Sequence, residues 1–260
     1  MSMIKHLIDN FHLEDIKNEK HSSVFFEHEN YDLFILRMPQ IQNNQIIFVS
    51  TAFVITDEGY YHYDKESQSF INLIDMKGFY KYLDRYIDNT LKIIAQNFDE
   101  IEIIEDSFYE GNTINNFNKQ WFVYKNNFVR INRVLFKAVE VIADLIEKYK
   151  QEDDYLERNF EDIEEHLQRA YRNSGLLLEK LDAIYNFHLT QNNEQMNKTV
   201  YILTLLSGIF LPLNLIVGFF GMNTTSLPFT IDAGGTFNVI SLLLGVGIVA
   251  TVLTYFIKRN

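Results

Sequence analysis

The hydrophobic pattern divides the chain into three parts. Between residues 23 and 75, short runs rich in Ile, Val, Phe and Tyr alternate with turn residues such as Asn43-Asn44 and Asp57-Glu58-Gly59. Such runs predict β-strands, expected at Val24–His28, Tyr31–Met38, Gln45–Ile55 and Gly59–Tyr63. Beyond residue 80, apolar residues recur every three or four positions, which predicts long amphipathic helices. The last quarter of the chain is almost free of charged residues.

Three long helices are expected in the middle part. The first has an apolar face over Leu83–Ile101 and is expected to stop at Gly111-Asn112. The second has its apolar face over Phe128–Leu145. In the third, the apolar positions over Leu156–His188 alternate steps of four and three. This heptad seam is typical of a helix that packs along copies of itself or along its neighbours.

The third helix is expected to continue without a break into the apolar part. No proline occurs between Pro39 and Pro212, and a proline inside a helix is the commonest cause of a break. One rod from Tyr155 to Phe220 is therefore the simplest interpretation.

Two apolar runs, Val200–Met222 and Phe237–Ile257, are each longer than 20 residues. About 20 apolar residues in a helix span the hydrocarbon core of a bilayer. Asp232 is the only acidic or basic residue from Thr199 to Ile257, whereas buried helices of a soluble core usually carry a charged face. The runs predict two transmembrane helices.

The flanking charges predict the topology. Lys198 precedes the first run, Lys258 and Arg259 follow the second, and the connecting loop Asn223–Thr236 contains neither Lys nor Arg. By the positive-inside rule, both termini are expected in the cytoplasm. The N-terminal residues lack the long apolar segment of a secretory signal.

Composition narrows the function classes. The chain has 260 residues, with Lys+Arg 23 against Asp+Glu 35 and a net charge of −12, which argues against a nucleic-acid partner. It has no cysteine, which excludes disulfides, Cys-ligated metal sites and a thiol nucleophile. Neither a Gly-rich phosphate loop nor a catalytic constellation is visible. We therefore expect no enzyme, no catalytic residue and no cofactor.

A polar stripe marks the first apolar run. When the spacing of three and four residues is continued from the heptad seam into this run, it falls on residues that are mostly polar or small. These residues are Asn197, Val200, Thr204, Ser207, Leu211, Asn214, Gly218 and Gly221. Polar groups within a bilayer face a protein interior or a water-filled path, so the stripe predicts a pore-lining face. Alternatively, Ser and Thr bond their own backbone and small residues let helices approach, but this explains the two asparagines poorly. Since one helix cannot enclose a pore, either several copies surround an axis or the stripe is only a helix contact, and the heptad seam favours symmetric assembly.

These residues resemble a known family. The stretch Thr204–Leu213 followed by Gly218–Asn223 is similar to the signature of the CorA superfamily of divalent metal ion transporters, whose hallmark is Gly-Met-Asn at the outer end of the first of two C-terminal membrane helices. The resemblance covers nearly the whole chain, weakly before residue 150. It implies an α+β cytoplasmic domain, a long stalk helix and two transmembrane helices, assembled as a homopentameric funnel in the bacterial inner membrane, in contact with lipid.

The resemblance also implies a division of the chain. The expected parts are a cytoplasmic α/β domain with the first helix at 1–112, a helical stalk region at 113–198, a pore-lining transmembrane helix at 199–222, an extracytoplasmic loop at 223–236, a second transmembrane helix at 237–257 and a cytoplasmic tail at 258–260.

Residue roles follow from the same resemblance. Gly221, Met222 and Asn223 match the selectivity motif, with Asn223 contacting a hydrated cation. Leu211 falls at an apolar constriction, Asn214 where the family often has Thr, and Val200 and Asn197 at the inner gate and the cytoplasmic mouth.

In the stalk, Asp162 matches an Asp that takes part in intersubunit metal sensing in the family. The preceding residue is Glu161, where the family usually has Arg, and the sequence does not identify a partner carboxylate. A solvated acidic helix face is the alternative for residues 152–165, and His166 is interpreted as part of the surface charge.

The pore chemistry suits magnesium. Because Mg²⁺ dehydrates reluctantly, neutral oxygen acceptors suit it as a hydrated ion, whereas charged ligands would hold it too tightly. We expect transport of Mg²⁺, with Co²⁺ and Ni²⁺ as surrogates and Mg²⁺ as a regulator. However, Thr224–Phe229 lacks an acidic residue common in magnesium members, and Met196–Tyr201 is similar to ZntB-type zinc transporters. Proton-coupled Zn²⁺ transport stays open, as does a membrane-tethered sensor or scaffold.

Overall fold

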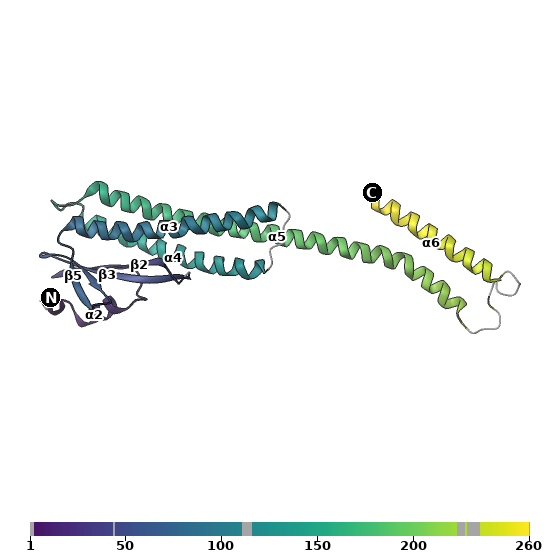
Figure 1. The fold of residues 1–260 in the computed structure, drawn as a ribbon, viewed down its shortest axis with the longest axis horizontal. Coiled ribbons are helices and arrows are strands. Elements are labelled where there is room, and N and C mark those ends of the chain that lie inside the picture. Colours follow the sequence, from purple (N-terminus) through teal and green to yellow (C-terminus); the bar gives the residue numbers. More distant parts are fainter. Residues whose placement is uncertain (1–2, 44, 111–115, 223–226, 228–234, 260) are drawn as a thin grey trace. The chain divides into compact units, whose positions relative to one another are not determined.

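The computed structural model describes residues 3–43, 45–110, 116–222, 227 and 235–259. The chain forms two compact units, Met1–Asn186 and Phe187–Asn260. One helix, α5 (Glu157–Phe220), belongs to both (Figure 1). The predicted continuous rod from Tyr155 to Phe220 is therefore confirmed to within two residues at its start.

The N-terminal unit contains an antiparallel sheet in which each strand pairs with the next in sequence. Its strands are β1 (Val24–His28), β2 (Tyr31–Gln42), β3 (Gln45–Thr56), β4 (Gly59–Asp64) and β5 (Ser69–Asn72). The four predicted strands are confirmed, and β5 was not predicted. This meander, with long helices added, is the expected α+β class.

Strand β2 runs beyond the end predicted for it at Met38. Pro39 lies inside β2 and pairs with Phe48 of β3. Strand β1 pairs with β2 only as far as Ile35. At Pro39, β2 is therefore an edge strand on that side, where a residue without an N–H is tolerated.

The sheet is buried on both faces. Side chains alternate along a strand, so Phe34 and Leu36 point to the side of the long helices, whereas Leu33 and Ile35 point to the N-terminal helices. Two short helices, α1 (Met3–Leu7) and α2 (Asn10–Lys17), supply the second side, and neither was predicted from the sequence. Burial on both faces explains why β2 is an almost continuous apolar run.

Two long helices, α3 (Met76–Tyr109) and α4 (Phe117–Tyr149), cover the first face of the sheet, and the N-terminal half of α5 packs against these two helices (Figure 1). Asp75 caps α3, because its Oδ1 accepts a hydrogen bond of 2.8 Å from the Gly78 N–H. The predicted apolar face of α4 is buried, and so is that of α3 except for Leu91 and Phe98, which are partly buried against the same core. The predicted stop at Gly111-Asn112 lies outside the described residues, and α3 ends just before it.

The heptad seam of α5 is occupied within a single chain. Its buried members pack against α3 and α4 in one core: Phe160, Ile163, Leu167, Ala170, Ser174, Leu177, Leu181 and Ile184. Polar contacts fix the same register, since Asn132 Nδ2 donates to Ser174 Oγ (2.9 Å) and Trp121 Nε1 donates to the Leu181 carbonyl (3.0 Å). Of the two explanations for the seam, packing along neighbours is correct, and the seam gives no argument for symmetric assembly.

The C-terminal unit contains the end of α5 and helix α6 (Gly235–Arg259). Both helices are long and apolar enough to cross a membrane, and almost none of their apolar segments is buried. Core helices of a soluble protein would be buried, so this exposure favours the predicted membrane spans. The predicted loop at 223–236 lies almost wholly outside the described residues.

Candidate functional site

The predicted polar stripe follows one exposed face of α5. All eight of its members are exposed in the single chain: Asn197, Val200, Thr204, Ser207, Leu211, Asn214, Gly218 and Gly221. Leu211 is 67% exposed. The stripe thus has no covering element within the described part of its own chain, and it remains available to another molecule or to water.

The stripe faces away from α6. The side of α5 that meets α6 carries Ile209, Leu213 and Val217, which line one groove with α6, and Gly208 and Pro212, which line another. At 3.6 residues per turn, Leu211 and Asn214 lie roughly on the opposite side of the helix from Ile209 and Leu213. Contact with α6 therefore does not account for the stripe.

Thr204 fits both explanations of the stripe. Its Oγ1 donates a hydrogen bond of 2.8 Å to the Val200 carbonyl, as a hydroxyl that bonds its own backbone does. The same bond uses up the hydroxyl hydrogen and leaves the oxygen lone pairs as acceptors. A hydrated cation presents water hydrogens, so an oxygen with only acceptor capacity matches it.

Pro212 interrupts the hydrogen-bond ladder within the span. A proline inside a helix has no N–H for the carbonyl four residues earlier, which here belongs to Gly208. Gly208 and Pro212 lie on the α6 side, so the freed carbonyl does not belong to the stripe.

The C-terminal end of α5 is closed by a tight turn. Gly221 N–H donates to the Val217 carbonyl (2.8 Å), and Met222 N–H donates to the Phe219 carbonyl (3.3 Å). A Cβ on Gly221 would lie 3.0 Å from the Val217 oxygen, closer than side chains normally come. Gly221 thus has a steric reason to be glycine. Asn223, the predicted cation ligand, lies outside the described residues.

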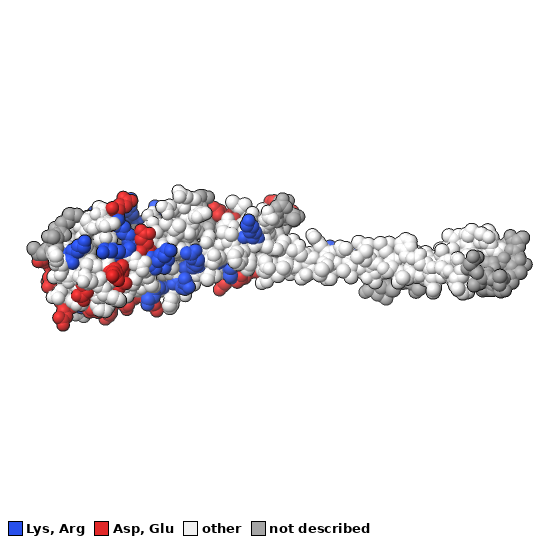
Figure 2. All heavy atoms as spheres, turned by 90° about the horizontal axis from the view of Figure 1, so that it is seen from below, with Lys and Arg blue, Asp and Glu red and all other residues white. Residues whose placement is uncertain are grey.

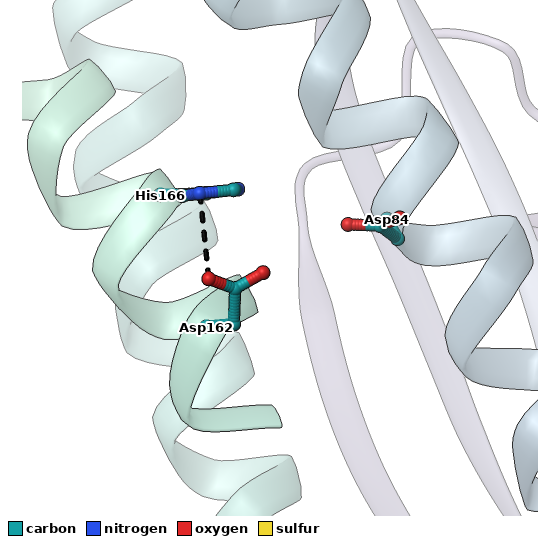
Figure 3. Close-up of side chains that lie close together, drawn as sticks. All are labelled: Asp84, Asp162 and His166. Carbon is teal, nitrogen blue, oxygen red and sulfur yellow. Dashed lines mark ion pairs between the residues drawn. The ribbon is translucent and has the colours of Figure 1, made fainter. Parts of the chain in front are cut away.

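A second site lies in the N-terminal unit. One donor atom each from Asp84 of α3 and from Asp162 and His166 of α5 lie within 4.8 Å of one another. Figure 3 shows Asp84 extending from α3 toward the two α5 side chains. His166 Nε2 is 3.5 Å from Asp162 Oδ1, and His166 Nδ1 is 3.8 Å from Asp88 Oδ1.

The two carboxylates suit Mg²⁺, and the imidazole of His166 is a ligand that Ni²⁺ or Zn²⁺ prefers. Two ligands on opposite sides of Mg²⁺, at about 2.1 Å each, are about 4.2 Å apart, so small side-chain rotations or a bridging water would close this site around an ion. The pKa of Asp84 is raised, first by burial and then by the negative charges of Asp88 and Asp162. A bound cation would relieve this repulsion between carboxylates.

The sequence revealed only part of this cluster. Asp162 was predicted, but His166 was interpreted as surface charge, which is wrong, because its half-buried ring contacts two carboxylates. The spacing of four between Asp162 and His166 places them on one helix face and was a readable signal. Asp84 comes from another helix, and nothing in the sequence pairs it with Asp162.

Comparison with known protein families shows to which family this chain belongs. A family model described as "CorA-like Mg2+ transporter protein" matches residues 4–259. The chain belongs to this family. The predicted resemblance to the CorA superfamily is thereby confirmed.

Individual relatives are distant. The "Cobalt/magnesium transport protein CorA" of Thermotoga maritima is 21% identical over 188 residues, which cover 70% of this chain and 51% of the relative. The chain spans about half the length, or less, of the curated relatives it matches.

Two solved structures share the CorA-like fold over almost the whole chain. The complete CorA magnesium transporter from Methanocaldococcus jannaschii gives a TM-score of 0.81 at 20% identity, covering 99% of this chain and 85% of the other. Full-length CmaX gives 0.70 at 16% identity, covering 97% and 81%. At these identities the likeness establishes the fold: an antiparallel sheet, a long helix and a C-terminal helix.

Proposed function

We propose that this chain is a CorA-type divalent cation transporter that moves Mg²⁺, with Co²⁺ and Ni²⁺ as surrogates, along a pore lined by α5. The observation that carries the proposal is the family match over residues 4–259. It is supported by a mainly polar or small face on an otherwise apolar α5, turned away from α6.

The proposed pathway uses neutral oxygen atoms. Asn214, Ser207 and Thr204 present amide and hydroxyl oxygens along one face, and Asn223 would add another at the outer mouth. Neutral acceptors contact the water shell of Mg²⁺ without removing it and without holding the ion too tightly to release. Rings of Leu211 and Val200 side chains would interrupt the water column and serve as gates by dewetting.

The pathway requires several copies of the chain. A single α5 cannot enclose an ion, so we propose a homopentamer in which the α5 stripes face a common axis and the α6 helices contact lipid. Such an assembly has a mass about five times that of the 30.7 kDa chain. The basic residues Lys198, Lys258 and Arg259 favour cytoplasmic termini in a bacterial inner membrane.

We assign the Asp84–Asp162–His166 cluster a regulatory role in this transporter. Mg²⁺ bound there would join α3 to α5, and α5 continues into the proposed pore. Occupancy would report the cytoplasmic concentration and reduce flux, provided that the ion binds the closed state more tightly than the open one.

The experiment that tests the proposal is cation flux into liposomes containing the purified full chain. Uptake of Mg²⁺ that Co²⁺ and Ni²⁺ inhibit, and that is independent of a pH gradient, is the expected result. Zn²⁺ uptake that requires a pH gradient and is not inhibited by Mg²⁺ would instead assign the protein to the zinc branch. No flux of any divalent cation would leave a membrane-tethered sensor or scaffold.

A further inference from the structure

Three arginines of the N-terminal unit have no carboxylate partner among the described residues, unlike five of its lysines. Five lysines pair with carboxylates: Lys125 with Asp182, Lys137 with Glu140, Lys148 with Glu27, Lys150 with Glu147 and Lys180 with Glu105. Within the described part of the chain, Arg37, Arg130 and Arg133 form no ion pair with a carboxylate. Other cations of this unit, such as Arg85 and Lys92, also form no ion pair in the described part of the chain, so the position of these three arginines is what distinguishes them.

The register of the sheet brings these arginines together. Arg37 of β2 is paired with Ser50 of β3, and Phe48 lies two residues before Ser50 along β3. Arg130 of α4 places its Cζ 4.4 Å from the centre of the Phe48 ring. Arg133 follows Arg130 by three residues, so the two share one side of α4. The three arginines therefore lie around the same end of the β2–β3 pair, close enough for the charges of Arg130 and Arg133 to act on Arg37.

The cluster is held in place by the protein. Arg37 Nη1 donates a hydrogen bond of 2.9 Å to the Lys20 carbonyl, whereas the buried Arg37 Nε has no hydrogen-bond partner among the described residues. The pKa of Arg37 is lowered, first by burial and then by the positive charges of Arg130 and Arg133. Because an arginine in a protein stays protonated, an anion is the way to relieve this repulsion.

We propose that Arg37, Arg130 and Arg133 form a binding site for a phosphate-bearing anion. The planar guanidinium group donates two parallel hydrogen bonds to phosphate oxygens, and three such groups match the multiple charge of a phosphate or diphosphate. Figure 2 shows Lys and Arg side chains gathered on one face of the N-terminal unit, in contrast to the acidic charge of the whole chain. The phosphate group can belong to a soluble diphosphate or to a lipid headgroup.

Isothermal titration of the detergent-solubilised full chain with inorganic pyrophosphate tests the site. The buffer contains EDTA and no Mg²⁺, so that chelation does not contribute heat. We expect saturable binding that weakens with added salt and falls at least about tenfold in Arg130→Gln and Arg133→Gln, because each variant loses hydrogen bonds to a charged group. Lys137→Gln is the matched control: it removes a charge from the next turn of α4 that Glu140 already neutralises (3.0 Å), and its affinity should stay within about twofold of wild type.

Competition separates the two sources of phosphate. Two competitors are compared for the concentration at which each displaces pyrophosphate: short-chain phosphatidylglycerol, added as monomers, and inorganic phosphate. If the ligand is a lipid headgroup, phosphatidylglycerol should displace pyrophosphate at the lower concentration. If the ligand is a soluble diphosphate, phosphatidylglycerol should require the higher concentration. Size-exclusion chromatography checks that each variant keeps its assembly. Absence of saturable binding by wild type, or equal weakening in Lys137→Gln, would overturn the proposal. A third outcome would also overturn it: the wild-type protein does not bind pyrophosphate, and the Arg133→Gln variant loses its oligomeric assembly. In that case the arginines would contact an acidic surface of a second copy of the chain.

Discussion

Asp84 of α3 and Asp162 of α5 direct their carboxylates to the same point in the N-terminal unit, with donor atoms no more than 4.8 Å apart once His166 is included. The two residues are far apart in sequence and meet only because the apolar faces of α3 and α5 share one core. The second of these helices also carries the polar stripe of the apolar span. A cation bound at this cluster would therefore link α3 to the helix that is proposed to line the pore.

Mg²⁺ should stabilise the full chain through this cluster. A ligand at one hundred times its dissociation constant adds about 2.7 kcal/mol to the free energy of unfolding, which corresponds to a rise of roughly 5–10 °C in melting temperature for a chain of this size. Differential scanning fluorimetry with and without Mg²⁺ measures the rise. It should fall by more than half in Asp162→Asn and in Asp84→Asn.

Glu165→Gln provides the control for that measurement, because it removes an exposed carboxylate of α5 outside the cluster. A Mg²⁺ shift that Glu165→Gln lowers as much as Asp162→Asn does would indicate diffuse attraction to the acidic surface rather than a site.

Stability should fall as the pH drops below about 6.5, partly because of His62. Burial lowers the pKa of His62 to about 4, and its Nε2 lies 3.0 Å from the Tyr82 hydroxyl. Below pH 6.5 the unfolded chain takes up a proton at this residue, whereas the folded chain does so only near pH 4. The free energy of unfolding therefore decreases over this window, by roughly 2–3 kcal/mol.

Chemical denaturation at several pH values between 7 and 4 measures the contribution of His62. In His62→Gln the slope of stability against pH should be smaller than in wild type, even if the variant is less stable at pH 7. Identical slopes in the two proteins would show that His62 does not titrate as the structure indicates.

Two glycine substitutions should change stability in opposite directions. A Cβ on Gly78, at the start of α3, would lie 2.0 Å from the Leu73 carbonyl oxygen, so Gly78→Ala must displace backbone and should cost about 2–3 kcal/mol. Gly175 lies inside α5, where a Cβ would meet only Asn132 Nδ2 at 3.7 Å. Gly175→Ala should leave the stability unchanged or raise it by up to about 1 kcal/mol. Thermal unfolding of both variants checks the contrast, which fails if both lower the melting temperature equally.

Patterns local to one element were sufficient to predict most of the fold. The strands, the long helices and the unbroken α5 follow from apolar periodicity and from the absence of proline between Pro39 and Pro212. The helices α1 and α2 were missed because they span too few turns for a period to appear, and β5 because its four residues are half-buried or exposed.

Contacts between different helices and strands could not be predicted from the single sequence. The heptad seam shows that α5 packs lengthwise but not against what, and only the structure identifies α3 and α4. For the same reason Asp84 could not be matched to Asp162, nor Arg37 to Arg130. The sequence did select the stripe through Asn214, because a polar residue in an apolar helix stands out without knowledge of its neighbours.

The central claim is that the Asn214 face of α5 conducts Mg²⁺, and uptake into liposomes containing Asn214→Ala tests it most directly. Leu215→Ala is the matched control, since Leu215 is the next residue, is 74% exposed and does not belong to the stripe. The account predicts that Asn214→Ala lowers the initial rate of Mg²⁺ uptake by about tenfold, because the variant loses an oxygen that contacts the hydrated ion. The rate of Leu215→Ala should stay within about twofold of that of the wild type. Equal rates in wild type and Asn214→Ala, or an equal change in Leu215→Ala, would contradict it.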